Sequence, residues 1–272
     1  MKAKIYAEDE GIPSGQISAV NEGKDGLLWV AHGKGISHYD GISWYTFADT
    51  LNLPRVQTRL EVSENNTIWV LGRGVFDLIF ARYRSNQWQQ LNIPQLRDNL
   101  TLSAFDSYAN TDRFIISDSE SIYMFNSDSG AWRPFNLPSG ILVADLKRIK
   151  FIDHKLFLFF NDRVLRYDYL NNQVELISDQ VSTPLDMIKL ESRYIILAVN
   201  QLLSVYNQKK TVILENFLAG NQLNLGELHS NQNRLFFRSA NFLHMYDLDS
   251  KNYYQLKTSF YGSQFQVSTL FF

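Results

Sequence analysis

The sequence has no cysteine among its 272 residues, which excludes disulfide bonds, thiolate nucleophiles and sulfur-ligated metal sites. A chain without cysteine is compatible with the cytoplasm and with the periplasm. Net charge is also nearly absent, because 26 basic residues face 28 acidic ones and leave a formal charge of -2. Proteins that bind nucleic acid or anionic membranes through charge carry a clear basic excess. We therefore predict no nucleic-acid partner.

Long hydrophobic runs are missing as well. The longest apolar stretches, such as 156–160 and 194–199, are far shorter than the roughly 20 residues that cross a bilayer as a helix. Residues 1–10 become acidic early and lack the apolar core of a signal peptide. We expect neither a signal peptide nor direct membrane insertion within this segment.

A repeat of about forty residues is present instead. An aromatic residue followed by a small polar or charged one recurs at intervals of 44, 42, 42, 39 and 40 residues. The six pairs are Tyr39-Asp40, Tyr83-Arg84, Phe125-Asn126, Tyr167-Asp168, Tyr206-Asn207 and Tyr246-Asp247. Repetition at this period is typical of arrays of one supersecondary unit.

Each unit contains four short runs of alternating apolar residues separated by turn signals. The first unit shows this most clearly, since Asp25-Gly26 and Asp40-Gly41 are strong hairpin signals. Four-stranded units at this period predict an all-β fold, a β-propeller with six recognisable four-stranded blades plus parts of a seventh. We expect the blades at about 17–47, 57–91, 101–135, 145–178, 185–216 and 225–257.

Two other folds explain the pattern less well. Candidate helices are short, rich in β-branched and aromatic residues, and lack a ten-residue run of 3.6-residue periodicity. A pair of β-sandwiches would account for the strands but not for the six-fold register. We expect residues 1–272 to form a single propeller domain, with all five tryptophans buried or half-buried between blades.

The two ends of the chain carry strand patterns that no unit uses. Residues 2–7 resemble a fourth strand and residues 265–272 a first strand. Joining the ends of a propeller in one blade removes unpaired sheet edges. Because the middle strands of this seventh blade are missing, we expect the chain to be a fragment of a longer protein.

The first unit resembles the two-component regulator propeller repeat, found in the sensory regions of bacterial hybrid histidine kinases and related signalling proteins. The resemblance rests on Gly11-Ile12-Pro13-Ser14, Asp25-Gly26-Leu27-Leu28-Trp29-Val30 and Gly35-Ile36-Ser37-His38-Tyr39-Asp40-Gly41. The match is strong over about one sixth of the chain and weakens to a strand rhythm after about residue 100. It implies a seven-bladed, usually periplasmic propeller joined to a membrane-anchored signalling output, and it brings no catalytic residues.

Residues that could carry chemistry are scattered. The five histidines show no metal-binding spacing, and we expect His38 and His244 to occupy equivalent third-strand positions with local partners. Glycine-rich segments such as Gly33-Lys34-Gly35 fit hairpin turns better than phosphate loops, and no Gly-x-Ser-x-Gly elbow exists. We predict no catalytic residues, no metal and no cofactor.

These observations favour a non-catalytic sensory or interaction module. Loops on a rigid scaffold concentrate binding residues, here the loops that join fourth to first strands and second to third strands. Basic candidates for an acidic sugar or another anion in these loops are Lys34, Arg55, Arg73 and Arg97. The partner would be a small molecule, a glycan or a protein, with output domains elsewhere in a longer chain. A propeller lyase or glycoside hydrolase and a purely structural scaffold are the alternatives.

Overall fold

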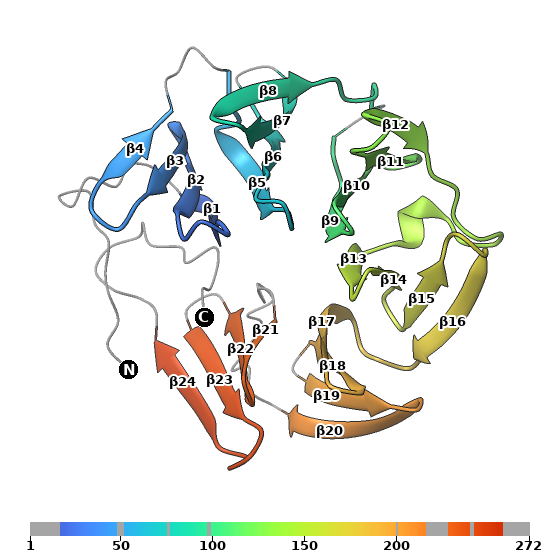
Figure 1. Cartoon of the computed structure of the whole chain (residues 1–272). Coiled ribbons are helices and arrows are strands. Elements are labelled where there is room, and N and C mark those ends of the chain that lie inside the picture. The colour runs from blue at the N-terminus through green and yellow to red at the C-terminus, as the bar shows by residue number, and fades with distance from the viewer. Residues whose placement is uncertain are drawn as a thin grey trace. The chain divides into compact units, whose positions relative to one another are not determined.

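The computed structural model describes residues 17–47, 52–74, 77–96, 99–199, 201–215, 228–239 and 242–257. These residues form six four-stranded antiparallel sheets, each with its strands in chain order, which is the blade of a β-propeller (Figure 1). The prediction of an all-β propeller with six four-stranded blades is confirmed. Within these ranges the only helix is the three-residue 3-10 turn η3, Val143–Asp145.

The chain divides into two compact units, one ending at Pro94 and the other beginning at Gln95. The first unit holds two blades. Blade 1 comprises β1 (Ile17–Glu22), β2 (Leu28–His32), β3 (Gly35–Tyr39) and β4 (Trp44–Thr46). Blade 2 comprises β5 (Val56–Val62), β6 (Ile68–Arg73), β7 (Leu78–Arg84) and β8 (Gln87–Leu91).

The second unit holds four blades. Blade 3 comprises β9 (Leu102–Tyr108), β10 (Thr111–Ser117), β11 (Ile122–Asn126) and β12 (Ala131–Pro134). Blade 4 comprises β13 (Arg148–Ile152), β14 (Lys155–Phe159), β15 (Val164–Asp168) and β16 (Gln173–Ser178). Blade 5 comprises β17 (Pro184–Leu190), β18 (Arg193–Ala198), β19 (Gln201–Tyr206) and β20 (Lys209–Glu215). Blade 6 comprises β21 (His229–Asn231), β22 (Arg234–Ser239), β23 (Phe242–Asp247) and β24 (Tyr253–Lys257).

The second strand of each blade is the most buried. Five consecutive residues are buried in β6 and four in each of β14 and β18, because both faces of the strand are covered. Strands buried on both faces read as continuous apolar runs rather than as alternation. This explains why Ile68-Trp69-Val70 and Leu156-Phe157-Leu158 are uninterrupted by polar residues.

The apolar cores lie between consecutive blades within each unit. In the first unit, Trp29 and Phe47 of blade 1 pack with Leu60, Ile68 and Val70 of blade 2. Three further clusters join blades 3 and 4, 4 and 5, and 5 and 6 in the second unit. Trp29 and Trp69 are buried, and Trp44, Trp88 and Trp132 are half-buried, as expected from the sequence.

Hairpin turns follow the backbone rules that the sequence indicates. Gly26 and Gly41 have positive φ angles of 80° and 97°, so the two Asp-Gly signals do mark turns. Later hairpins reach the same conformation without glycine, as at Asp153 and His154, whose φ angles are 47° and 61°. Asparagine, aspartate and histidine are the residues that tolerate this left-handed region best.

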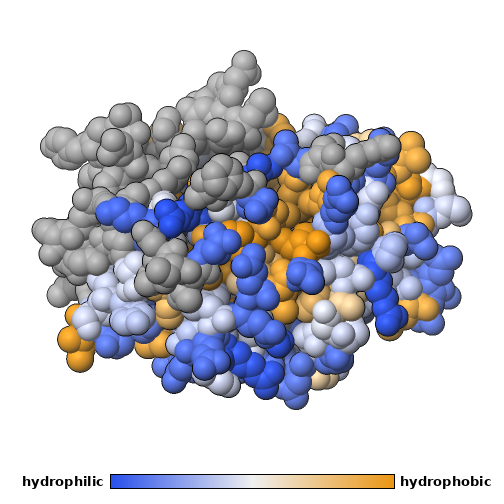
Figure 2. All heavy atoms as spheres, turned by 90° about the horizontal axis from the view of Figure 1, so that it is seen from above, coloured by the Kyte–Doolittle hydropathy of each residue, from blue (hydrophilic) through white to orange (hydrophobic). Residues whose placement is uncertain are grey.

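The surface mixes residue types, with hydrophilic and hydrophobic side chains interleaved on the face shown in Figure 2. Large exposed apolar side chains occur on turns and outer strands, such as Ile42, Leu170 and Val212. No helix in the described ranges has the length and hydropathy needed to span a bilayer. The terminal segments 2–7 and 265–272 lie outside the described residues, so the single-domain and fragment predictions stay predictions.

Candidate functional site

Irregular strand pairing gathers at one end of the blades. We call this end of a blade the 2–3 end, because the turn between the second and third strands and the connection that enters the first strand both lie there. Five sheet pairings contain a register shift, and all five shifts lie at the 2–3 end of their blade. They occur at Ile17/Ala19, Val56/Arg59, Val164/Leu165, Pro184/Asp186 and Leu202/Leu203. Bulges recur beside functional sites because they redirect side chains out of the regular pleat. The 2–3 end is therefore the region in which to look for a site.

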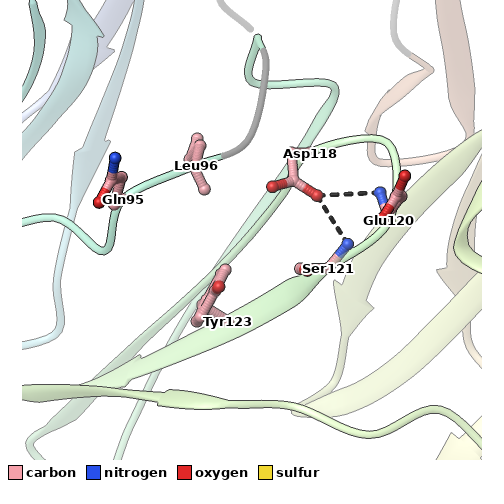
Figure 3. A pocket seen from close by; sticks show the side chains of 6 residues that line it. All are labelled: Gln95, Leu96, Asp118, Glu120, Ser121 and Tyr123. Atoms are coloured by element: carbon pink, nitrogen blue, oxygen red, sulfur yellow. Dashed lines mark hydrogen bonds between the residues drawn. The ribbon is translucent and has the colours of Figure 1, made fainter.

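A pocket of about 540 Å³ lies at the 2–3 end of blade 3, entirely within the second unit (Figure 3). Gln95 and Leu96 contribute from the segment that leads into β9. Asp118, Glu120 and Ser121 contribute from the turn between β10 and β11, and Tyr123 from β11 itself. These are the two classes of connection in which the sequence predicts binding residues.

Asp118 fixes the shape of the turn that borders the pocket. Its Oδ1 accepts hydrogen bonds from the backbone N–H groups of Glu120 at 2.9 Å and Ser121 at 2.6 Å, drawn as dashed lines in Figure 3. The backbone carbonyl of Asp118 accepts a further bond from the Thr101 hydroxyl at 2.9 Å. Asp118 itself is almost fully buried, at 1% exposure. A short aspartate that binds backbone N–H groups two and three residues ahead is a common way to rigidify a turn.

The lining chemistry suits a neutral or hydroxyl-rich ligand. Glu120 presents an exposed carboxylate, and Gln95 presents an exposed amide that both donates and accepts. The half-buried Tyr123 offers an aromatic surface together with a hydroxyl. A volume of this order matches the clefts that hold small molecules.

Three of the four basic candidates lie at the 2–3 ends of the first unit. Lys34 is exposed in the turn between β2 and β3. Arg55 and Arg73 are brought together by the start of the β5–β6 ladder, where Arg55 N–H donates to the Arg73 carbonyl at 2.8 Å. Arg97 lies outside the described residues. None of the three described residues lines the blade 3 pocket.

Close backbone packing places Arg55 and Arg73. A Cβ atom at Gly72 would lie 2.8 Å from Thr58 Cα and 3.0 Å from Pro54 Cβ, so only glycine fits beneath the bulge in β5. The bulge spans Val56 to Arg59 and redirects the entry to the strand. The sequence predicts the two arginines as binding candidates, but no sequence pattern indicates the close approach of Gly72 to Thr58 and Pro54.

Two buried histidines also lie at 2–3 ends, one in blade 1 and one in blade 6. Each bonds to a serine on the neighbouring strand of its own blade. In blade 1, His32 of β2 bonds through Nε2 to Ser37 Oγ of β3 at 2.7 Å. In blade 6, Ser239 of β22 bonds to His244 Nε2 of β23 at 2.8 Å. Burial, joined at His32 by the charge of Lys34, lowers the pKa of both histidines from 6.5 to about 4.

The expected equivalence of His38 and His244 is wrong. His38 pairs with Trp29, and the pair at the same place in blade 6 is Phe236 with Met245. His244 pairs with Phe237, so it lies one residue away from the position that corresponds to His38. The residue that matches His244 in blade 1 is Ser37, and His38 matches Met245. Side chains alternate between faces along a strand, so this one-residue offset places the two histidines on opposite faces.

The sequence did not point to the pocket residues or to a second polar cluster. In that cluster Asp186 of β17 is fully buried between Lys150 and Arg148 of β13. The turn sequence Ser117-Asp118-Ser119-Glu120-Ser121 and the alternation of Arg148 and Lys150 were the available signals. Across the described ranges, no group of three or more histidine, aspartate or glutamate side chains could hold a metal ion.

No family model matches the chain, and no curated protein matches it in sequence. Solved structures do match. The extracellular domain of the hybrid two-component system BT3049 from B. thetaiotaomicron is similar with a TM-score of 0.68 and 12% identity, over 91% of this chain and 35% of that one. The corresponding domain of BT4673 from B. thetaiotaomicron gives 0.65 and 15%, over 94% and 34%.

Virginiamycin B lyase from Staphylococcus aureus is similar to the same degree, with a TM-score of 0.64 and 12% identity over 89% of this chain and 84% of the lyase. At these identities the likenesses show the fold alone. This chain spans about a third of the two extracellular domains that it matches.

Proposed function

We propose that this chain is a non-catalytic sensory module, a β-propeller that recognises a ligand or a partner protein within a bacterial signal-transduction protein. The observation that carries the proposal is the blade 3 pocket, formed by the two classes of loop at the 2–3 end. Likeness to extracellular domains of two hybrid two-component systems adds support from the fold.

The same likeness supports a location outside the cytoplasm. Both similar domains are extracellular parts of larger signalling systems. We propose a periplasmic location for this chain, with output domains elsewhere in a longer protein.

The proposed ligand is a small molecule or a glycan held by hydrogen bonds and one aromatic contact. Sugar hydroxyls donate well to carboxylates and amides such as those of Glu120 and Gln95, and a sugar face packs on an aromatic ring such as that of Tyr123. Lys34, Arg55, Arg73 and Arg97 remain our candidates for an acidic group. They supply the guanidinium and ammonium donors that carboxylates prefer.

Binding to a glycan panel tests the proposal. Wild-type protein should retain one class of glycan, and Tyr123→Ala should weaken that binding about tenfold, as expected when one aromatic contact is lost. Tyr254→Ala is the matched control, because Tyr254 is an exposed tyrosine on the outer strand β24. Equal binding by wild type and Tyr123→Ala would place the site elsewhere. A double charge reversal, Arg55→Glu with Arg73→Glu, tests the basic candidates, and unchanged binding would remove them.

An enzyme is the second candidate, favoured by the likeness to a lyase. The six residues that line the pocket include no histidine, so general base catalysis there would fall to Asp118 or Glu120. Asp118 is committed to its turn through Oδ1. Release of a shortened or unsaturated glycan on incubation with wild-type protein would favour the enzyme over the sensor.

A further inference from the structure

A histidine side chain joins blades 3 and 4 at the ends opposite their 2–3 ends. His154 lies in the two-residue turn between β13 and β14, and its Nδ1 lies 2.8 Å from Asp106 Oδ1 of β9. The ring of Tyr108, the last residue of β9, stacks on the imidazole of His154 with the two centroids 4.1 Å apart. The three side chains, which we call the His154 cluster, come from neighbouring blades of the second unit.

Asp106 fixes which imidazole nitrogen carries the proton. A carboxylate only accepts hydrogen bonds, so Nδ1 of His154 is the donor in this contact. The Asp106 side chain is 6% exposed, and its second oxygen, Oδ2, lies 3.3 Å from Nη1 of Arg113. Arg113 is opposite Asp106 in the ladder of β9 and β10. In the neutral imidazole, Nε2 therefore keeps its lone pair and is an acceptor.

The acceptor nitrogen lies on the solvent side of the ring. The His154 side chain is 42% exposed, whereas the carboxylate that holds its Nδ1 is buried. The two nitrogens point to different sides of an imidazole, so Nε2 lies on the side away from Asp106. Within the described ranges Nε2 of His154 has no hydrogen-bond partner. It is therefore accessible to a donor group of a ligand.

An exposed aromatic ring lies beside this acceptor. Tyr108 is 50% exposed, although His154 covers one face of its ring. Asn110 is exposed in the adjoining turn between β9 and β10, and its amide both donates and accepts. Ligand sites combine aromatic side chains with a small number of well-placed polar groups. A sugar matches both, since it has an apolar face and hydroxyl donors.

We propose that the His154 cluster is a second ligand site, which binds a neutral sugar or another polyol. A ligand hydroxyl donates to Nε2 of His154, and the carbon face of the ligand packs on Tyr108. Asp106 is the positioning residue, because it holds the imidazole in the tautomer that accepts. Fixing the ring beforehand lowers the entropic cost of binding. The site goes beyond the proposed function, which rests on the blade 3 pocket at the other end of the blade.

Nitrogen-15 spectra of the histidine side chains test the proposal. In the protein alone at pH 8, His154 should show a protonated Nδ1 and an unprotonated Nε2, and the reverse tautomer would overturn the site. Maltose, cellobiose, lactose and sorbitol are then titrated in turn. At least one should shift the Nε2 signal of His154, with saturation at millimolar concentrations. Absence of a saturable shift with all of these probes would overturn the proposal.

Variants test the two contacts separately, with binding followed at other signals of the cluster. His154→Phe keeps a ring for Tyr108 to stack on but has no acceptor, so it should lose the saturable binding. Tyr108→Ala should weaken binding about tenfold. Tyr254→Ala is the matched control, because Tyr254 is also 50% exposed but lies on β24, and it should bind as wild type does.

Equal binding by wild type and His154→Phe would contradict the proposal. If His154→Phe fails to fold, the Nε2 signal of the wild type decides the question without a variant. Tyr123→Ala changes the blade 3 pocket only, and it should keep the shift of the His154 signal. Failure of the pocket and failure of this site are therefore distinguishable.

Discussion

His32 of blade 1 and His244 of blade 6 each bond to a serine on the neighbouring strand, but the histidine is on the second strand in blade 1 and on the third strand in blade 6. His32 is the last residue of a second strand and its serine partner is five residues ahead, whereas His244 is on a third strand and its serine is five residues behind. Each contact continues to the fourth strand, through Thr46 Oγ1 at 2.8 Å in blade 1 and the Tyr253 hydroxyl at 2.6 Å in blade 6. The imidazole of His244 thus contacts both neighbouring strands of blade 6 directly, whereas in blade 1 Ser37 makes the link from His32 to the fourth strand.

Folding stability should fall as the pH drops below 6.5. The unfolded histidines take up protons near pH 6.5, but the buried ones do so only near the folded pKa of about 4. Stability is therefore complete above pH 6.5 and is lost progressively as the pH falls to about 4. Each histidine should cost about 2 kcal/mol at pH 5.

Urea unfolding at pH 7.5 and pH 5 measures this loss. His32→Gln cannot titrate and keeps a donor near Ser37, so its stability should fall by about 2 kcal/mol less than that of wild type between the two pH values. Equal losses in the two proteins would show that His32 does not govern the pH dependence.

Asp186→Asn should destabilise the second unit by on the order of 3 kcal/mol, because it leaves two partly buried cations without their carboxylate. The exposed Asp162, paired with Arg163, provides the control, and Asp162→Asn should change stability by less than about 0.5 kcal/mol. Urea unfolding of both variants at pH 7 makes the comparison. A loss at Asp186 no larger than that at Asp162 would show that the contacts of Asp186 with Lys150 and Arg148 do not stabilise the fold.

Gly72→Ala should cost about 1–3 kcal/mol, since the new methyl group would lie 2.8 Å from Thr58 Cα and 2.9 Å from Thr58 Oγ1. Gly130→Asn is a suitable comparison. Gly130 has a φ of 63°, which asparagine tolerates, and no atom lies within 4 Å of its added Cβ. Chemical denaturation should show Gly72→Ala as clearly the less stable variant. The reverse order would mean that the packing under the β5 bulge is loose.

Trp29→Ala should cost about 3–5 kcal/mol, because it removes a side chain of 1% exposure from the core between blades 1 and 2. Trp44 of the same blade is half-buried on the outer strand, and Trp44→Ala should cost less. Denaturant midpoints of the two variants provide the measurement. Similar losses would argue against a core centred on the second strands.

The fold was largely predictable from the sequence, because propeller blades are local. Each repeat of about forty residues carries its own turn signals and its own buried second strand. The aromatic-polar pairs such as Tyr39-Asp40 and Tyr246-Asp247 therefore marked the ends of third strands even where the family pattern had faded. Turns without glycine, such as Asp153-His154, were less visible but did not disturb the spacing.

The candidate site was predictable only in outline. The sequence indicated the two loop classes, but the pocket depends on which loops approach each other across 22 residues, as Leu96 and Asp118 do. The cluster around Asp186 joins residues 36 positions apart in different blades. The predicted equivalence of His38 and His244 was wrong because it depends on strand register, and a one-residue offset separates His38 from the position that corresponds to His244. Pairing between distant segments leaves no local pattern from which to infer it.

Hydrogen–deuterium exchange with and without the glycan retained from the panel tests the central claim, that the blade 3 pocket is a ligand-binding site. The amides of Glu120 and Ser121, which already donate to Asp118, should exchange more slowly when the pocket is filled, and the bound glycan should be recovered with its mass unchanged. Protection confined to other blades, or a glycan recovered with an altered mass, would contradict the account.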